Sequence, residues 1–323
     1  MSEFYLSELS QRDKPWDCHR SLADQVRDLY QGTEYADYAD RIAICAKFLE
    51  FALITCSDEQ VFKLQTTWFC RVRHCPVCQW RRSLMWRARF IKALPEINTA
   101  YPTARWIFLT LTVRSCQPTE LRTTLQQMNK SWERLTKRKV FPALGWVKSF
   151  EVTRNSESGL AHPHFHILMM VSPGYFKGQA YLSQQKWRDL WKSALRVDYD
   201  PWIDVRVVRP KSNLVDPSSA ITDAVRETMK YTVKEQDLVA DASWLIEITR
   251  QLHKTRAIGL GGVLKNYLSE QEPEQEDLIH ADDVVGEVLP DDPRWWFSWR
   301  ERVQHYMGQE KELTTDDPFG KPD

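Results

Sequence analysis

The chain has 323 residues, a length that allows two or three structural units with a sizeable core. Its formal net charge is zero, and no apolar run approaches the ~20 residues that a membrane-spanning helix needs. Its first residues are charged and lack an apolar stretch, so we expect no secretory signal and a cytoplasmic location. Seven cysteines, an odd number, suit a reducing compartment and a metal better than a disulfide framework.

The charges are unevenly distributed along the chain. Residues 270–323 hold 16 Asp and Glu against 5 Lys and Arg, a net charge of −11, so residues 1–269 carry +11. Charges that only solvate a surface would explain the total but not this segregation. A basic body with an acidic tail indicates a polyanionic partner for the body, with nucleic acid as the candidate.

The hydrophobic pattern predicts an α+β protein whose strands and helices alternate through its middle. An amphipathic period over 37–54 predicts that 1–55 is a helical region. A cysteine-rich knuckle with a basic helix follows at 56–100, and then the main domain at 101–268. The strands predicted there are 105–115, 145–155, 161–171 and 202–210, and the helices are 118–139, 183–195, 218–238 and 241–254.

The composition changes after residue 268. Residues 269–293 contain no Lys or Arg and are predicted to be a flexible acidic linker. Residues 294–323 are predicted to form an aromatic amphipathic helix with a short tail. This C-terminal part would recruit a host helicase or polymerase, cover a basic groove of the same chain, or simply pack as a tethered helix.

Three of the eight histidines lie at alternate positions of one predicted strand. His162, His164 and His166 share a face, because side chains two apart on a strand point to the same side. If the turn before this strand centres on 157–158, Glu151 lies opposite His164 on that face. Imidazoles and a carboxylate that leave coordination positions open predict a catalytic divalent-metal site. A register shifted by one residue would turn Glu151 into the core.

Other interpretations of the histidine strand stay open at this point. A single histidine on an apolar strand usually bonds to a backbone or hydroxyl partner and does nothing more. The alternation also resembles the histidine-triad nucleotide hydrolases, in which a histidine attacks an α-phosphate. A metallo-β-lactamase site needs His-x-His-x-Asp, and Leu168 stands where the aspartate would be, which excludes that class.

A tyrosine in the predicted helix 218–238 is the candidate nucleophile. On a helix Glu227 and Tyr231 are i and i+4, and Lys230 and Lys234 lie close to the tyrosine. A phenol is a poor nucleophile at neutral pH unless a metal or a cation assists it. The lysines are candidates to stabilise phenolate or phosphate, and Glu227 is a candidate general base. Taken alone, a tyrosine among lysines is more often a solvated helix face. With the histidine strand, it suggests phosphoryl transfer.

Three segments together resemble a known family. "FLTLT" at 108–112, "HPHFH" at 162–166 and "ETMKYTVK" at 227–234 follow the order and rough spacing of three motifs in rolling-circle plasmid replication initiators. The match is to the HUH endonuclease branch with a single catalytic tyrosine, and it covers residues 56–265. It implies a central antiparallel sheet flanked by helices, and nicking and rejoining of one strand at an origin.

The same resemblance assigns roles to residues. It implies that His164 and His166 bind Mg²⁺ or Mn²⁺ and that Tyr231 forms a 5′-phosphotyrosyl link. It also implies that Glu227 activates water or assists the second transfer. Glu151 as a further ligand rests on the strand register alone. The implied partner is single-stranded or hairpin origin DNA of a plasmid.

A cysteine knuckle precedes the main domain. Cys70, Cys75 and Cys78 have finger-like spacing, and Cys56 lies 14 residues before Cys70. Four thiolates would form a closed structural zinc site for a segment too small to fold alone. We predict Cys56 as the fourth ligand with His74 as the alternative, and reduced thiols without metal remain possible. Three cysteines have no spacing partner and are interpreted as ordinary small apolar residues: Cys18, Cys45 and Cys116.

Basic and aromatic residues after the knuckle suggest a DNA-binding track. Arginine pairs with phosphate and exposed indoles stack on unpaired bases, although Trp80 and Trp86 also suit a core. The predicted DNA-binding residues are Arg81, Arg82, Arg87, Arg89, Trp86, Arg206, Arg209, Lys211 and Lys265.

Alternatives to an initiator differ in their chemistry. A single-tyrosine transposase or relaxase would use the same reaction. A zinc-dependent DNA-binding regulator would have a purely structural histidine strand and would cleave nothing.

Overall fold

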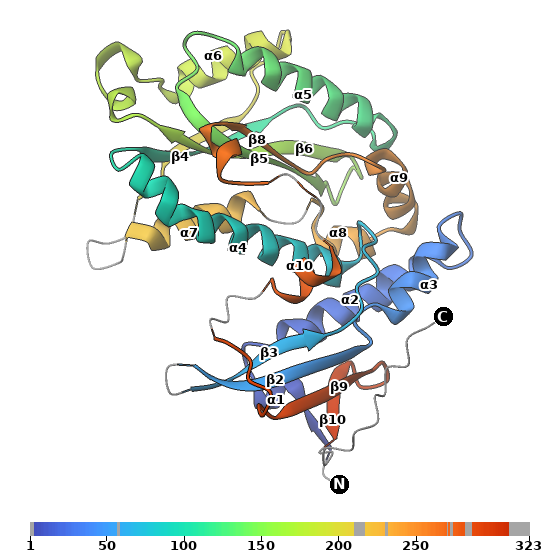
Figure 1. Ribbon diagram of the computed structural model, residues 1–323. Coiled ribbons are helices and arrows are strands. Elements are labelled where there is room, and N and C mark those ends of the chain that lie inside the picture. Colours follow the sequence, from blue (N-terminus) through green and yellow to red (C-terminus); the bar gives the residue numbers. More distant parts are fainter. Residues whose placement is uncertain are drawn as a thin grey trace.

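The computed structural model describes residues 3–56, 59–209, 217–229, 232–269, 271, 274–281 and 286–309. Within these residues the chain forms two five-stranded antiparallel sheets with helices around and between them (Figure 1). The helices are α1 (Leu6–Leu9), α2 (Pro15–Tyr30), α3 (Ala36–Ile44), α4 (Pro76–Ala100), α5 (Leu121–Thr136), α6 (Gln184–Leu195), α7 (Pro217–Thr228), α8 (Glu235–Val239), α9 (Ala242–Leu252) and α10 (Gln275–Ile279). The strands are β1 (Glu3–Tyr5), β2 (Phe48–Cys56), β3 (Glu59–Thr66), β4 (Arg105–Thr112), β5 (Ala143–Arg154), β6 (Ala161–Val171), β7 (Ile203–Val207), β8 (Ile258–Gly262), β9 (Arg294–Arg300) and β10 (His305–Gln309).

The histidine sheet has the strand order β7-β4-β6-β5-β8. Its central strand β6 is apolar on both faces beyond the histidines, as a strand covered on both sides must be. Phe165 and Ile167 belong to the core shared with α5 and α6, and Leu168 and Met170 belong to the core shared with α4 and α7. Figure 1 shows these two pairs of helices on opposite faces of the sheet. A central antiparallel sheet flanked by helices is therefore present, as predicted.

The terminal sheet has the order β1-β10-β9-β2-β3 and joins the two ends of the chain. Two predictions are wrong here: Phe48–Cys56 is a strand rather than part of a helical region, and 294–309 form two strands joined by a turn rather than a helix. Helix α3 ends at Ile44, before β2 begins. Strand β2 pairs with both β3 and β9, so its backbone N–H and C=O groups form their hydrogen bonds with neighbouring strands rather than within a helix. In β9 the aromatic residues Trp295, Phe297 and Trp299 stand two apart, a strand period that buries Phe297 and Trp299.

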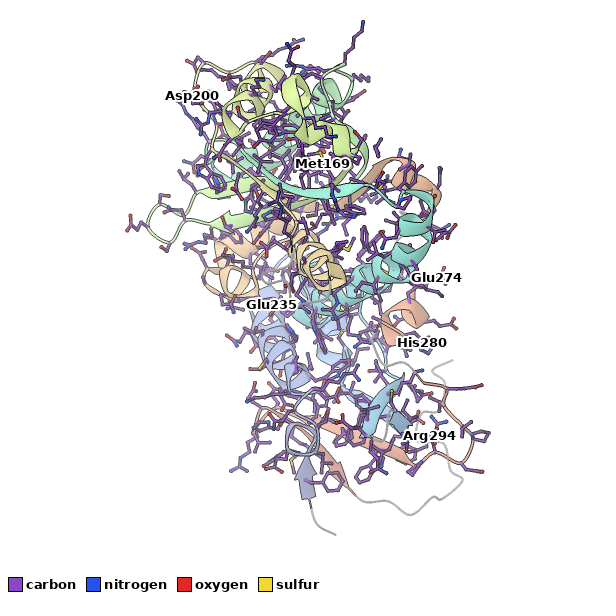
Figure 2. The ribbon with its side chains drawn as sticks, turned by 90° about the vertical axis from the view of Figure 1, so that its left-hand side faces the viewer. Met169, Asp200, Glu235, Glu274, His280 and Arg294 are labelled. Carbon is purple, nitrogen blue, oxygen red and sulfur yellow. The ribbon has the colours of Figure 1, made fainter. Side chains whose placement is uncertain are left out.

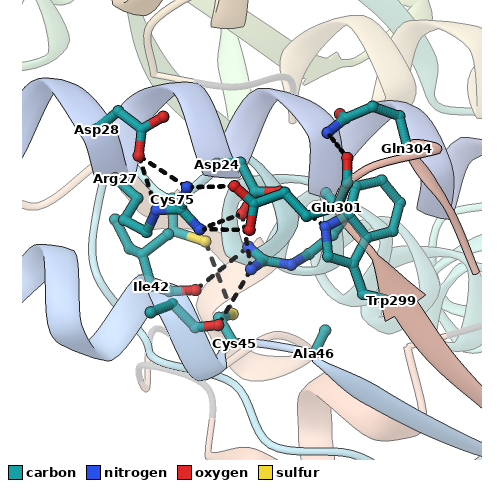
Figure 3. A network of polar contacts seen from close by, with 12 residues as sticks. Asp24, Arg27, Asp28, Ile42, Cys45, Ala46, Cys75, Trp299, Glu301 and Gln304 are labelled. Atoms are coloured by element: carbon teal, nitrogen blue, oxygen red, sulfur yellow. Dashed lines mark hydrogen bonds and ion pairs between the residues drawn. The ribbon is translucent and has the colours of Figure 1, made fainter.

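A buried polar network fastens α2 to the C-terminal hairpin (Figure 3). The Arg20 guanidinium lies 2.9 Å from the Asp24 carboxylate, and the Trp299 indole donates to the other oxygen of Asp24 at 2.7 Å. At the surface of this network, Arg27 pairs with Glu301 at 2.7 Å. Burial raises the pKa of Asp24, and the Arg20 charge and the Trp299 hydrogen bond oppose that rise. The first and last described segments are thus one folding unit.

Part of the predicted acidic linker is a packed helix. The Arg81 side chain donates to the carbonyl oxygens of Leu278 and Ile279 at 2.8 and 2.9 Å, which holds the end of α10 against α4. Arg89 pairs with Asp277 at 3.0 Å. Figure 2 shows Glu274 and His280, on either side of α10, at the level between the two sheets. None of the described helices is long and apolar enough to cross a membrane.

Candidate metal centres and tyrosine segment

The strand register brings a carboxylate and two imidazoles together on the histidine sheet. Glu151 of β5 lies opposite His164 of β6, and Ser149 lies opposite His166, which confirms the predicted register. All four side chains face α4 and α7, because positions two apart on a strand share a face. The hairpin between Arg154 and Ala161 fixes this register, so the group is held by backbone pairing on both strands.

The ligand atoms of this group converge on one point. An oxygen of Glu151 lies 3.1 Å from Nε2 of His164 and 3.0 Å from Nε2 of His166. Ligand atoms about 2.1 Å from an octahedral cation and at right angles would be about 3.0 Å apart, so the spacing fits a divalent ion. Glu151, His164 and His166 are therefore the residues that could hold one.

Hydrogen bonding around the group favours metal-binding tautomers. Nδ1 of His164 donates to the carbonyl oxygen of His162 at 3.3 Å, so its Nε2 can either carry a proton toward Glu151 or, without that proton, present a lone pair to a cation. Burial works to raise the pKa of the Glu151 carboxyl, but the hydrogen bonds from the two histidines outweigh burial and lower the pKa. A carboxylate facing imidazole lone pairs needs a proton or a cation between them, which is the chemistry of a ligand set.

His162 lies at the edge of the group rather than within it. Its Nδ1 is 3.3 Å from the hydroxyl of Ser115, and it is not one of the three converging side chains. Burial, and then the charge of His164, lowers the pKa of His162. The sequence-based inclusion of His162 as a metal ligand is therefore not supported by the geometry.

The tyrosine segment differs from the predicted continuous helix 218–238. Helix α7 ends at Thr228, and Lys234 is the exposed residue before α8, so Glu227 and Lys234 do not share one helix face. Glu227 is half-buried on the last turn of α7. Tyr231 and Lys230 lie outside the described residues.

Two hydrogen bonds fasten the chain on either side of residues 230–231. The Ser149 hydroxyl donates to the carbonyl oxygen of Thr228 at the end of α7. The Val152 backbone N–H donates to the carbonyl oxygen of Thr232 at 2.8 Å, and Val152 and Val233 form a parallel bridge. Ser149 and Val152 flank Glu151 on β5. The chain therefore contacts β5 at Thr228 and again at Thr232, at two points of the strand that lie on either side of Glu151.

Four buried thiols form the second group, and one prediction about it is wrong. Cys45, Cys70, Cys75 and Cys78 converge, with Sγ–Sγ distances of 3.6 Å for 45–78 and 70–78 and 3.7 Å for 45–75. A tetrahedral zinc with Zn–S bonds of about 2.3 Å would separate its sulfurs by about 3.8 Å, so the spacing fits. Cys56, the predicted fourth ligand, pairs with Glu59 at the far end of β2 and is outside the group.

The position of Cys45 follows from the local chain path. Cys45 ends α3, and the next residue, Ala46, donates its backbone N–H to the carbonyl oxygen of Trp68, which sets Cys45 beside Cys70. Burial raises the pKa of the Cys45 and Cys70 thiols, so a bound cation is what would hold them as thiolates. The other predicted ligand, His74, is fully buried but is not one of the converging side chains.

The predicted DNA track is largely structural. Arg81 and Trp86 are buried, Arg89 is paired with Asp277, and Arg82 donates to the carbonyl oxygen of Arg71, so Arg81 in particular is wrong as a DNA contact. The remaining candidates differ in exposure: Arg87 is half-buried, Arg206, Arg209 and Lys265 are exposed, and Lys211 lies outside the described residues.

Comparisons with known proteins give one consistent result. A family model described as "Replication protein" (Rep_1) matches residues 61–307. A "Protein rep" from Streptococcus pneumoniae serotype 2 is 31% identical over 286 residues, which cover 86% of this chain and 87% of the relative. One from Lentilactobacillus hilgardii is 32% identical over 317 residues, covering 90% and 96%. A "Replication protein" from Staphylococcus aureus is 36% identical over 204 residues, covering 59% and 86%. No solved structure matches the chain significantly.

Proposed function

Because the chain belongs to the Rep_1 family of replication proteins, we propose that it starts rolling-circle replication of a plasmid by nicking and rejoining one strand of the origin. The proposed reaction is a transesterification in which Tyr231 is the nucleophile. The observation that supports the proposal is the pair of hydrogen bonds, from Ser149 to Thr228 and from Val152 to Thr232, which fasten the described residues on either side of 230–231 to the part of β5 that carries Glu151.

Each residue has a task in this reaction. Glu151, His164 and His166 would hold a divalent cation, which supplies Lewis-acid stabilisation of charge on a phosphate oxygen. The Tyr231 oxygen forms a bond to phosphorus while the bond from phosphorus to the 3′ oxygen breaks. The phenol proton leaves to a base, and the 3′ oxygen takes up a proton to become a hydroxyl. The bond energy is kept as a 5′-phosphotyrosyl ester.

Glu227 is proposed to act in the later step that ends a cycle. It stands on the last turn of α7, one residue before the Thr228 carbonyl that is bonded to the metal-binding face. A carboxylate there can accept a proton from water or from an incoming 3′ hydroxyl, which then attacks the phosphotyrosyl ester. Lys230 and Lys234 are proposed to stabilise phosphate charge near this segment.

The test is formation of a covalent protein–DNA adduct. The full chain is incubated with single-stranded origin DNA and Mn²⁺, and the products are separated on a denaturing gel. We expect an adduct that Tyr231→Phe abolishes and that Glu227→Gln still forms but resolves more slowly. The matched control is Tyr199→Phe, on a half-buried loop tyrosine whose ring lies under the Arg114 guanidinium, which should leave the adduct unchanged.

Two outcomes would contradict the proposal in different ways. An adduct that still forms in Tyr231→Phe would show that Tyr231 is not the nucleophile. Binding of origin DNA with no adduct under any divalent ion would favour the zinc-dependent regulator that the sequence left as an alternative.

A further inference from the structure

A cavity of about 460 Å³ lies beside the tyrosine segment. Its walls come from the chain around the start of α4, from Ser149 of β5, from the turn 254–258 that enters β8, and from Met229 and Thr232. The last two are the described residues that flank 230–231. This volume is in the range that accepts a nucleotide-sized ligand.

The lining is strongly cationic. Five basic side chains line the cavity, and no Asp or Glu is among the described residues that do so. The five are Arg71, Arg73, Arg82, Lys254 and Arg256. Several hydroxyls and the buried Trp86 ring complete the wall. Cations, hydroxyls and an aromatic surface without carboxylates suit a phosphate that carries a sugar and a base.

Two of these cations occupy a backbone conformation that L-residues rarely adopt. Arg71 has φ 57° and Lys254 has φ 54°, and both side chains are exposed at the cavity. Arg82 donates to the carbonyl oxygen of Arg71, and Arg73 donates to that of Thr255, so the two turns are fixed to each other. Strained turns that present charge into one cavity are typical of ligand-binding positions.

The cavity continues the face that carries the metal ligands. Ser149 lines it, and Ser149 lies opposite His166 and two residues from Glu151 on the same face of β5. Two residues of an extended strand span about 7 Å, a short step along a DNA backbone. A strand with one phosphate at the Glu151–His164–His166 group can therefore place a neighbouring nucleotide in the cavity.

We infer that this cavity is a binding site for a nucleotide of the same single strand, next to the one that is cut, with Arg71 and Lys254 contacting its phosphate. The inference rests on the proposed function for the identity of the strand. It places the phosphate contacts on the turns at 71 and 254, whereas the sequence predicted them on the basic helix, of which Arg82 and Trp86 line the cavity. A free nucleotide has the same phosphate chemistry, so the test must separate the two.

The experiment measures binding without divalent ions, so that no reaction occurs. The probe is a fluorescent dT oligonucleotide of about 12 nucleotides, titrated with the full chain at several salt concentrations. The variant is Arg71→Asn with Lys254→Asn, because asparagine tolerates positive φ and removes both charges. We expect a loss of more than about tenfold in affinity and a salt slope that is shallower by about 0.7, from one phosphate that is no longer neutralised.

The matched control is Arg196→Asn. Arg196 is also an exposed arginine with positive φ (61°), but it caps α6 on the opposite face of the sheet, and this variant should bind as the unaltered chain does. A neutral methylphosphonate placed at single positions of the oligonucleotide should weaken binding by the unaltered chain at one position and have no effect there on the double variant. Thermal unfolding of each variant establishes that it is folded.

The outcomes separate this inference from the proposed function. Unchanged affinity and salt slope in the folded double variant would overturn the inference even if the Tyr231 adduct forms normally. If the double variant binds more weakly but the unaltered chain forms no adduct, the inference stands and the proposed reaction is wrong. A dTMP competitor that binds as tightly as the oligonucleotide would show a free-nucleotide site and overturn the assignment to the strand.

Discussion

The two candidate metal centres of this protein are built in opposite ways. The thiol group has four ligands, each at most 1% exposed, drawn from the end of α3, the chain before α4 and the first turn of α4. The Glu151–His164–His166 group has three ligands on one sheet face, and His164 keeps some exposure. A site whose ligands are all protein and all buried holds structure together, whereas one with positions left for substrate can do chemistry.

The difference also lies in which contacts create each centre. Adjacent strands of one hairpin create the Glu151–His164–His166 group, so it depends on local register. The thiol group joins residue 45 to residues 70–78 and therefore holds the end of α3 against the start of α4. Loss of the Glu151–His164–His166 group should stop the reaction, whereas loss of the thiol group should lower the stability of the fold.

The largest effect is expected at the thiol group. Cys45→Ser should remove one zinc ligand and lower the free energy of unfolding by about 4 kcal/mol or more, because metal binding is coupled to folding. Thermal unfolding and the metal content of the purified protein measure this. Cys56→Ser is the matched control and should change neither. If the two variants behaved alike, the four-thiol centre would be wrong.

A large loss of activity without loss of stability is expected at the other centre. Glu151→Gln keeps the shape of the side chain but removes its charge, and adduct formation should fall by about 10²- to 10³-fold. The unfolding midpoint should stay within a few degrees of that of the unaltered chain. If Glu151→Gln unfolded as readily as Cys45→Ser, both centres would be structural and the proposed difference between them would be wrong.

Metal removal should act on the two centres at different rates. Brief treatment with a chelator should abolish adduct formation, and added Mn²⁺ should restore it, because a three-ligand site exchanges its ion readily. Zinc should remain until the thiols are modified or the chain unfolds. Metal analysis before and after treatment reports both. Simultaneous loss of zinc and activity would indicate that the centres are not independent.

A smaller effect is expected where the tyrosine segment meets the sheet. Ser149→Ala removes the hydroxyl that bonds to the Thr228 carbonyl, which should cost about 1 kcal/mol of stability and lower the adduct rate by about tenfold. Ser115→Ala, whose hydroxyl lies near His162, is the control and should leave the rate nearly unchanged. An unchanged rate in Ser149→Ala would mean that the bond does not position the nucleophile.

Local patterns in the sequence were sufficient for the central part of the protein. Four of the five strands of the histidine sheet (β4, β5, β6 and β7), the α5, α6 and α9 helices and the Glu151–His164 pairing were predicted, because a hairpin and a two-residue period involve only near neighbours. Strand β8, whose glycine-rich segment has no clear period, was not predicted. The resemblance to replication initiators, based on three short motifs, is confirmed by the family match. The roles of Tyr231 and Glu227 remain predictions.

The errors share a different cause. Cys45 was interpreted as an ordinary apolar residue because no spacing rule links it to Cys70; only the path of the chain from α3 into β2 brings the two together. Arg81 was assigned to DNA because its neighbours are basic, but a carbonyl pair nearly 200 residues away accepts its hydrogen bonds. Helical periodicity over 37–54 misled in the same way, since one of the two strand partners of β2, strand β9, is at the other end of the chain.

The sequence by itself determined the chemistry: three histidines in alternation, a carboxylate at hairpin distance, a tyrosine near lysines and a set of thiols. The tertiary structure decided which of these groups meet, that the two ends of the chain form one sheet, and that cations at 71, 82 and 254 line one cavity. The physical reason is that residue types and short periods are local properties. Partners brought together by closing long loops depend on the packing of the whole chain.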